Sequence, residues 1–82
     1  MRFLRPADFR LPDSPERLFG RAGAPWHLEV GFGDGRFWAA QHRLEDANYL
    51  GVEVSGVSVL KALARYRAAG VERAVLARVA AE

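Results

Sequence analysis

The sequence predicts an α/β fold in which parallel strands and helices alternate in the order βαβαβ. A short apolar strand, Trp26 to Val30, leads into a segment with glycine at every second position. A helix-like pattern follows, and a second strand and helix come after it. Strands joined by short connections that each carry a helix pair in parallel through right-handed crossovers, with the helices covering the sheet.

Residues 1–25 are expected to form an irregular arm. They contain all four prolines of the chain, Pro6, Pro12, Pro15 and Pro25. One helical turn is predicted over Ser14 to Gly20, where a capping serine precedes a proline at the first helical position and a glycine follows. We therefore divide the chain into this arm and a regular part, residues 26–82, which has the pattern of the first half of a larger α/β domain.

The elements after the first strand follow in order: a helix over Gly35 to about Leu44, a strand over Asn48 to Val54, a helix over about Gly56 to Ala69, and a strand over Val71 to about Ala80. The first helix opens with Phe37 and Trp38, which we expect in the core. The second helix has the clearer signal, because apolar residues recur at three- and four-residue spacing at Val59, Leu60, Leu63 and Ala64. Ser55 fits its N-cap and Gly70 its C-terminal stop. The last strand is rich in alanine, which is a poor strand former.

Length and composition exclude several classes of protein. A chain of 82 residues allows one domain at most, and the absence of cysteine excludes disulfides and thiolate metal sites. His27 and His42 have no partners at metal-ligand spacing, so no metal is expected. No apolar run approaches the roughly 20 residues of a membrane span. We expect a soluble, cytoplasmic protein that does not bind membranes.

The basic residues are unevenly distributed. Eleven of the twelve are arginine, and five of these lie in the arm, at Arg2, Arg5, Arg10, Arg17 and Arg21. Arginine suits contact with phosphate groups. A general arginine bias of the genome would produce the same count, so both interpretations stay open.

The glycine segment and Glu53 together predict a nucleotide-type cofactor site. Glycine has no Cβ, so the backbone can turn sharply and leave room for a ligand. Glu53 ends the second strand about 20 residues further on, where βαβ folds bind a ribose. The dinucleotide fingerprint requires a third glycine where this chain has Arg36, so a dinucleotide oxidoreductase is disfavoured. Arg36 at a helix start also indicates a nearby carboxylate or anion.

The spacing Glu29-x-Gly31-x-Gly33-x-Gly35 resembles motif one of class I S-adenosylmethionine-dependent methyltransferases. Three blocks in order are similar to the tRNA (guanine-N7-)-methyltransferase family: Leu28 to Phe37, Asn48 to Val54, and Ser58 to Leu63. The phenylalanine between the first two glycines and the Gly-Val-Glu-Val ending of the second strand are the more specific elements. The resemblance covers about residues 26 to 70.

The resemblance implies a Rossmann-like half of a class I methyltransferase sheet, S-adenosyl-L-methionine as cofactor, and a guanine in tRNA as the methylated group. It implies that the cofactor is bound by Glu29, Gly31, Phe32, Gly33, Gly35, Glu53 and Val54. Glu29 would lie beside the cofactor ammonium, or else accept backbone N–H bonds from the glycine loop. Glu53 would accept the ribose hydroxyls, or else be a strand end that faces solvent.

The chain also departs from the family pattern. The family's aspartate after the third strand is replaced by Val79-Ala80-Ala81-Glu82. Its catalytic and guanine-recognising residues would lie beyond residue 82, so we assign no catalytic residue and expect this chain alone, an N-terminal portion, to be inactive. The alternatives are a methyltransferase with another substrate and a non-catalytic Rossmann-like module that binds a nucleotide or a partner. A sheet cut short in this way would expose the Trp26 to Val30 edge, which predicts self-association through that edge or the helix faces.

Overall fold

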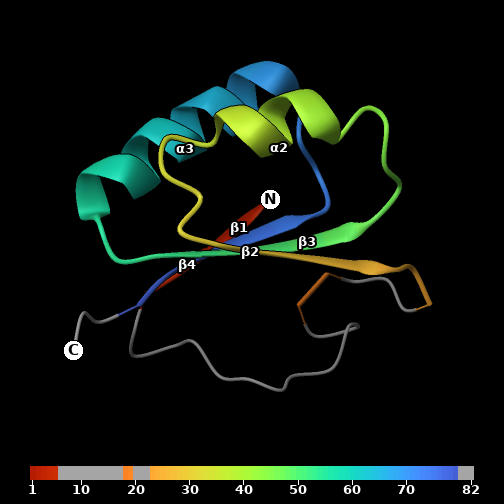
Figure 1. Cartoon of the computed structure of the whole chain (residues 1–82), viewed down its shortest axis with the longest axis horizontal. Coiled ribbons are helices and arrows are strands. Elements are labelled where there is room, and N and C mark those ends of the chain that lie inside the picture. The colour runs from red at the N-terminus through yellow and green to blue at the C-terminus, as the bar shows by residue number, and fades with distance from the viewer. Residues whose placement is uncertain (6–17, 20–22, 80–82) are drawn as a thin grey trace.

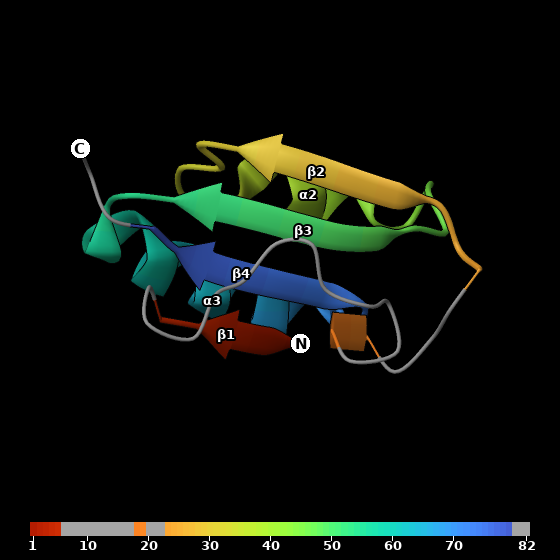
Figure 2. The ribbon, with the colours of Figure 1, turned by 90° about the horizontal axis from the view of Figure 1, so that it is seen from below.

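The computed structural model describes residues 1–5, 18–19 and 23–79. In this part of the chain, β1 (Arg2–Leu4), β2 (Trp26–Val30), β3 (Asn48–Glu53) and β4 (Ala74–Arg78) form one parallel sheet in the order β1-β4-β3-β2 (Figure 2). The helices α2 (Arg36–Gln41) and α3 (Gly56–Ala69) cover the same face of this sheet (Figure 1). The predicted α/β fold, with parallel strands joined by helices, is confirmed.

One strand lies where the sequence predicts an irregular arm. The first strand, β1, pairs with β4, and Leu4 lies opposite Ala77. Leu4 is buried with Leu18, Leu50 and Val75, in a small cluster on the face that the helices do not cover. Three residues are too few to show an alternating pattern, so this strand depends on the edge of β4 and on the burial of Leu4. The predicted turn over Ser14 to Gly20 is described only at Leu18 and Phe19, which are helical; its other residues lie outside the described part.

The main core lies between the sheet and the two helices. Trp38, Tyr49 and Tyr66 are at its centre, and the Trp38 and Tyr49 rings stack with centroids 4.5 Å apart. The predicted core position of Trp38 is confirmed. The same prediction is wrong for Phe37, since half of that side chain is exposed. Phe37 lies over the edge strand β2, near the ring of His27, where no further described strand covers it.

Helix α3 has the predicted ends but a different buried face. Ser55 Oγ accepts the Ser58 N–H at 3.2 Å, and Gly70 ends the helix at φ 74°. The buried residues are Val59, Ala62 and Tyr66, whereas the predicted Leu60 is 69% exposed. Apolar residues form more than one stripe on this helix. The stripe with the small Ala62 faces inward because it packs directly against the backbone of Gly35.

Two predicted elements are shorter in the structure. Helix α2 ends at Gln41 instead of about Leu44, because the chain turns there: the Leu44 N–H donates to the carbonyl of Gln41 at 2.9 Å. The last strand is confirmed over Ala74–Arg78, inside the predicted range from Val71 to about Ala80. Burial compensates for the poor strand propensity of alanine, since four of its five residues are buried.

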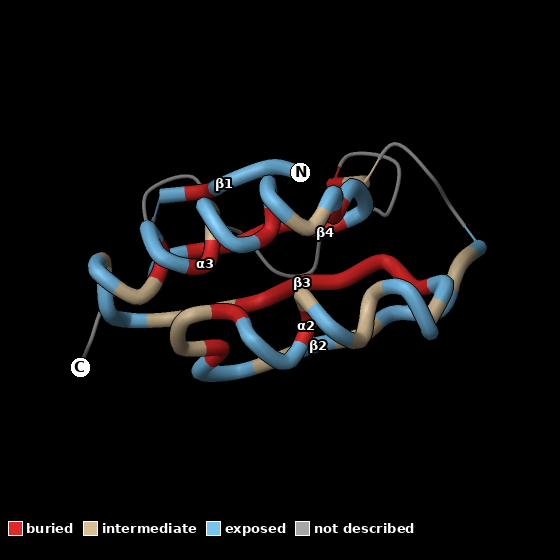
Figure 3. Tube along the Cα trace, turned by 90° about the horizontal axis from the view of Figure 1, so that it is seen from above, coloured by how far each residue is buried: buried red, intermediate tan, exposed pale blue. Residues whose placement is uncertain are grey.

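Strand β2 lies at the edge of the described sheet and is exposed or partly exposed along its length (Figure 3). Alternate side chains of this edge strand, Trp26, Leu28 and Val30, are 41%, 57% and 76% exposed and point away from the helices. A free strand edge beside apolar side chains favours pairing with another chain. Within the described residues, this is the edge that the sequence predicts to be uncovered.

We therefore expect the chain to self-associate at micromolar concentration, and Val30→Lys to shift it toward the monomer, because an edge lysine opposes strand pairing. Sedimentation velocity measures both. The matched variant Val57→Lys places the same charge on an exposed position of α3 and tests the helix faces as the alternative contact. A clean monomer for the wild-type chain at high micromolar concentration would contradict the expectation.

Candidate functional site

Three segments meet at the carboxyl ends of the parallel strands. The loop Gly31 to Gly35 follows β2, Glu53 ends β3, and residues 54–55 connect β3 to α3. Strands β2 and β3 are in a register that places Val30 opposite Val52, and the Gly31 N–H donates to the carbonyl of Val52 at 2.7 Å. Ligands of open α/β sheets bind at this end of the strands.

The three glycines of the loop have different roles. All have positive φ, at 74°, 60° and 84° for Gly31, Gly33 and Gly35. A Cβ added to Gly31 or Gly33 would meet nothing within 4 Å, so these two border open space. A Cβ on Gly35 would lie 2.7 Å from Tyr66 Cε1 and 2.9 Å from Ala62 Cβ. The first two glycines therefore leave room for a ligand, whereas the third lets the loop pack against α3.

Glu53 connects the glycine loop to the start of α3. Its Oε1 accepts the Gly33 N–H at 2.9 Å, and its Oε2 accepts the N–H groups of Val54 and Ser55 at 2.8 and 3.0 Å. These backbone hydrogen bonds, that of Ser55 first, hold the pKa of Glu53 below its ordinary value. Glu53 is partly exposed at the strand end, and it also has three backbone partners. The carboxylate therefore ties the glycine loop to the segment that begins α3.

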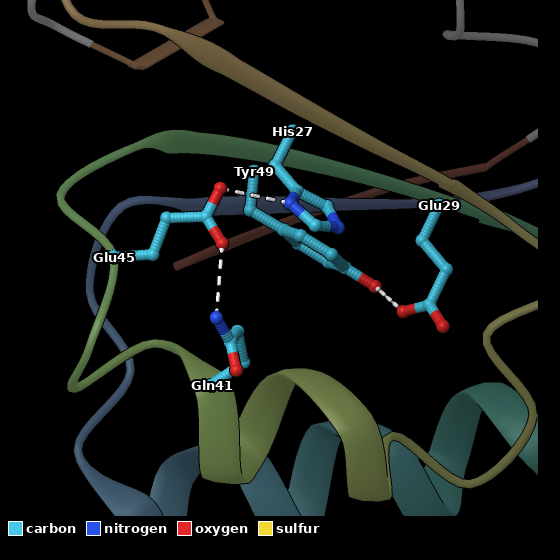
Figure 4. Close-up of polar contacts among 5 residues, drawn as sticks. All are labelled: His27, Glu29, Gln41, Glu45 and Tyr49. Carbon is cyan, nitrogen blue, oxygen red and sulfur yellow. Dashed lines mark hydrogen bonds and ion pairs between the residues drawn. The ribbon is translucent and has the colours of Figure 1, made fainter.

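Glu29 has a different partner from either of those considered from the sequence. Tyr49 donates its hydroxyl proton to Glu29 Oε1 at 2.5 Å (Figure 4). Among the described residues, Oε2 has no hydrogen-bond partner and is turned away from the tyrosine (Figure 4). The glycine-loop N–H that Glu29 was considered to accept goes to Glu53 instead. One oxygen of Glu29 thus remains able to accept a bond from a ligand.

Phe32 and Val54, the other two predicted site residues, present different groups. The Phe32 side chain is buried in the helix-side core, so only its backbone faces the loop, where its carbonyl accepts the Gly35 N–H at 3.1 Å. The Val54 side chain is half-exposed beside Glu53 and offers an apolar surface. The structure brings all seven predicted residues to one end of the sheet, but Phe32 and Gly35 face its core.

Comparison with known proteins gives the context of this site. No protein-family model matches the chain. Three similar proteins carry the name tRNA (guanine-N(7)-)-methyltransferase. The one from Deinococcus radiodurans is 54% identical over 81 residues, which are 95% of this chain and 25% of that protein. The one from Thermus thermophilus is 53% identical over 62 residues, 74% of this chain and 20% of that protein.

The third, from Synechococcus sp., is 41% identical over 61 residues, 68% of this chain and 25% of that protein. The chain belongs to the tRNA (guanine-N7-)-methyltransferase family. It spans a quarter or less of the length of these relatives.

Several residues of this candidate site could not be found from its motifs. Tyr49 reaches Glu29 from the neighbouring strand, and Arg78 of β4 donates to the carbonyl of Val54 at 3.3 Å. Neither residue lies in the glycine motif, and only the register of the strands brings them to the site. The carboxylate indicated by Arg36 is Asp34, which it contacts at 2.9 Å.

A second polar group joins the start of β2 to the connection between α2 and β3, away from the glycine loop. His27 Nδ1 contacts Glu45 Oε1 at 3.0 Å, and Gln41 Nε2 donates to Glu45 Oε2 at 3.4 Å (Figure 4). His27 is therefore a hydrogen-bonded histidine. In the described residues no group of three or more potential ligands could hold a metal ion, and no helix there is long and apolar enough to cross a membrane.

The pKa values of three carboxylates predict loss of stability in acid. A hydrogen bond from Arg36 lowers the pKa of Asp34, and one from His27 lowers that of Glu45. In the folded chain the pKa of Asp34 lies below the ordinary 3.8 of aspartate, and the pKa values of Glu45 and Glu53 lie below the ordinary 4.5 of glutamate. Such groups stabilise the fold above the unfolded pKa, and this stabilisation is lost as pH falls through the folded pKa.

We expect the melting temperature, followed by circular dichroism, to be nearly constant between about pH 7 and 5 and to fall below about pH 4.5. The variant Glu45→Gln should reduce that fall, since it removes one of the three carboxylates. A melting temperature that does not change between about pH 5 and 3 would contradict the prediction.

Proposed function

We propose that this protein takes part in methyl transfer from S-adenosyl-L-methionine to N7 of a guanine in tRNA. The observation that carries the proposal is the pair of carboxylates, Glu29 and Glu53, on either side of an open glycine loop in a chain whose relatives are named for this reaction. The relatives are longer than the chain, so the activity belongs to a protein of their length.

The residues at the site fit the polar ends of this cofactor. We propose that Glu53 accepts the ribose hydroxyls, and that Oε2 of Glu29 accepts the ammonium of the methionine-like end. The open side of Gly31 and Gly33 would take the body of the molecule, and the exposed side chain of Val54 would contact the adenine. Phe32 would contribute through its backbone, and Gly35 by holding the loop on α3.

The bound cofactor supplies an electrophilic methyl group on a sulfonium. The N7 lone pair of guanine is already nucleophilic, so the protein has chiefly to hold the two reactants in line. A rigid loop serves this purpose, because a small misplacement of a reactant costs much of the rate. The hydrogen bonds of Glu53 to three backbone N–H groups provide that rigidity.

We further propose that the arm contributes to binding of the tRNA backbone through its arginines, of which Arg10, Arg17 and Arg21 lie outside the described residues. The affinity for tRNA should then fall steeply as the salt concentration rises. A tRNA substrate and a chain without cysteine both fit a cytoplasmic location.

Calorimetry tests the cofactor assignment. The chain should bind S-adenosylhomocysteine and should bind a nicotinamide dinucleotide more weakly or not at all. Tighter binding of the nicotinamide nucleotide would overturn the methyltransferase assignment. The substrate is tested separately, by transfer of a labelled methyl group to tRNA in a protein of the relatives' length, and product without N7-methylguanine would point to a methyltransferase of another specificity.

A further inference from the structure

A chain of hydroxyl groups runs from α3 through β3 to Glu29. Tyr66 donates its hydroxyl to the Tyr49 oxygen at 3.2 Å, and Tyr49 donates to Glu29 Oε1 at 2.5 Å. The second distance is that of a charge-assisted O–H···O⁻ bond. Because the Tyr49 oxygen accepts a hydrogen bond from Tyr66 and its single hydroxyl proton is donated to Glu29, the direction of the chain is fixed and ends on the carboxylate.

The position of the Tyr49 ring is fixed on several sides. It stacks on Trp38 at 4.5 Å and meets the edge of Tyr66 at 6.0 Å, and both tyrosines are fully buried. Gly51 leaves space for the Tyr49 hydroxyl, because it has no side chain. It lies opposite Glu29 in the neighbouring strand, and a Cβ there would be 2.9 Å from the Tyr49 oxygen. The missing side chain lets Tyr49 reach Glu29.

Tyr49 remains a donor over the working pH range. Burial, together with the hydrogen bond to Glu29, raises its pKa far above the ordinary value of 10.0, and burial raises the pKa of Tyr66 to about 12. Oε1 of Glu29 therefore accepts the Tyr49 hydroxyl throughout this pH range. A carboxylate held at one oxygen presents the other in one direction.

We propose that Tyr49 is a positioning residue, which holds Glu29 by one oxygen so that the other is presented to the cationic amino-acid end of the cofactor. This proposal rests on the proposed function. It assigns a specific role to a residue outside the glycine motif: Tyr49 contributes to recognition of the amino-acid end and leaves recognition of the nucleoside to other residues.

Two ligands separate this role from a merely structural one. S-adenosylhomocysteine carries the ammonium, whereas methylthioadenosine has the same nucleoside without it. By calorimetry on the full chain, Tyr49→Phe should weaken binding of S-adenosylhomocysteine by about tenfold or more, since a hydrogen bond to a charged group is lost. Binding of methylthioadenosine should stay within about twofold of the wild-type value, because that ligand does not use Glu29.

The matched control is Tyr66→Phe, which removes a buried hydroxyl of the same chain but leaves the bond between Tyr49 and Glu29 in place. It should retain most of the affinity for S-adenosylhomocysteine. In the Glu29→Gln background, Tyr49→Phe should add little further loss, because both changes act on the same contact. Melting curves of each variant show whether it is folded.

The outcomes separate the two proposals. Selective loss of S-adenosylhomocysteine supports the positioning role. Equal loss of both ligands in a folded Tyr49→Phe variant, or no loss of either, overturns that role and leaves the proposed function standing. If Tyr49→Phe does not fold, the Glu29→Gln variant decides: equal affinity of that variant and the wild-type chain for S-adenosylhomocysteine overturns the role. Failure of a protein of the relatives' length to bind either ligand overturns both proposals.

Discussion

Replacing Gly35 by alanine should lower the free energy of unfolding by about 3 kcal/mol, because overpacking and an unfavourable backbone conformation act at one position. The added Cβ would lie 2.7 Å from Tyr66 Cε1 and 2.9 Å from Ala62 Cβ, at a residue whose φ is 84°. Neither neighbour can move easily, since Tyr66 is fully buried and Ala62 lies in the middle of α3. The loop and the helix would have to separate.

Gly23→Ala is the matched control. Gly23 has the same φ of 84°, but a Cβ there would meet nothing within 4 Å. Gly23→Ala should lower the free energy of unfolding by about 1 kcal/mol, through the unfavourable backbone conformation alone. Urea unfolding followed by circular dichroism measures both variants. Equal losses at the two positions would show that backbone strain alone matters and that the contact between the loop and α3 contributes nothing.

The variant Glu53→Gln should weaken S-adenosylhomocysteine binding by about tenfold to a hundredfold. Both oxygens of Glu53 accept backbone N–H groups, those of Gly33, Val54 and Ser55. An amide has one oxygen only, so its NH₂ group would face either the Gly33 donor or the two donors of Val54 and Ser55 and leave them unpaired. The loop would lose one of its fixed contacts, and the ribose would lose an anionic acceptor.

Glu72→Gln makes the same chemical change at an exposed position before β4, at the opposite end of the strands from Glu53. It should bind S-adenosylhomocysteine as the wild-type chain does. Calorimetry compares the three proteins, and melting curves separate the two roles of Glu53. Weaker binding with an unchanged melting temperature supports a direct contact with the ribose, whereas a parallel fall in both indicates that Glu53 acts through the loop. Unchanged affinity would contradict the proposed site.

Local sequence was sufficient for the order of elements in residues 26–79 and for the ends of α3. Ser55 and Gly70 act on backbone groups within a few residues of themselves, so their effect can be predicted without knowledge of the rest of the chain. The positions of Glu29 and Glu53 at the ends of two successive strands follow from the parallel order of the strands in the same way.

The contacts of these residues could not be predicted in the same way. Glu53 accepts the glycine-loop N–H that could equally have gone to Glu29, and Glu29 is held by a tyrosine 20 residues away. The buried face of α3 was decided by which of its apolar stripes fits against Gly35. Each of these outcomes depends on distances between segments that are remote in the sequence.

The sequence by itself therefore determined the α/β class, the glycine loop and the two carboxylates beside it, because glycine freedom, capping and strand-helix periodicity are properties of short segments. Only the tertiary structure decided that Arg2–Leu4 joins the sheet, that Phe32 and Gly35 face its core, and that Tyr49 donates a hydrogen bond to Glu29. The physical reason is that packing and hydrogen bonding act between whichever groups the fold brings within a few ångströms, and short-range sequence patterns do not record those pairs.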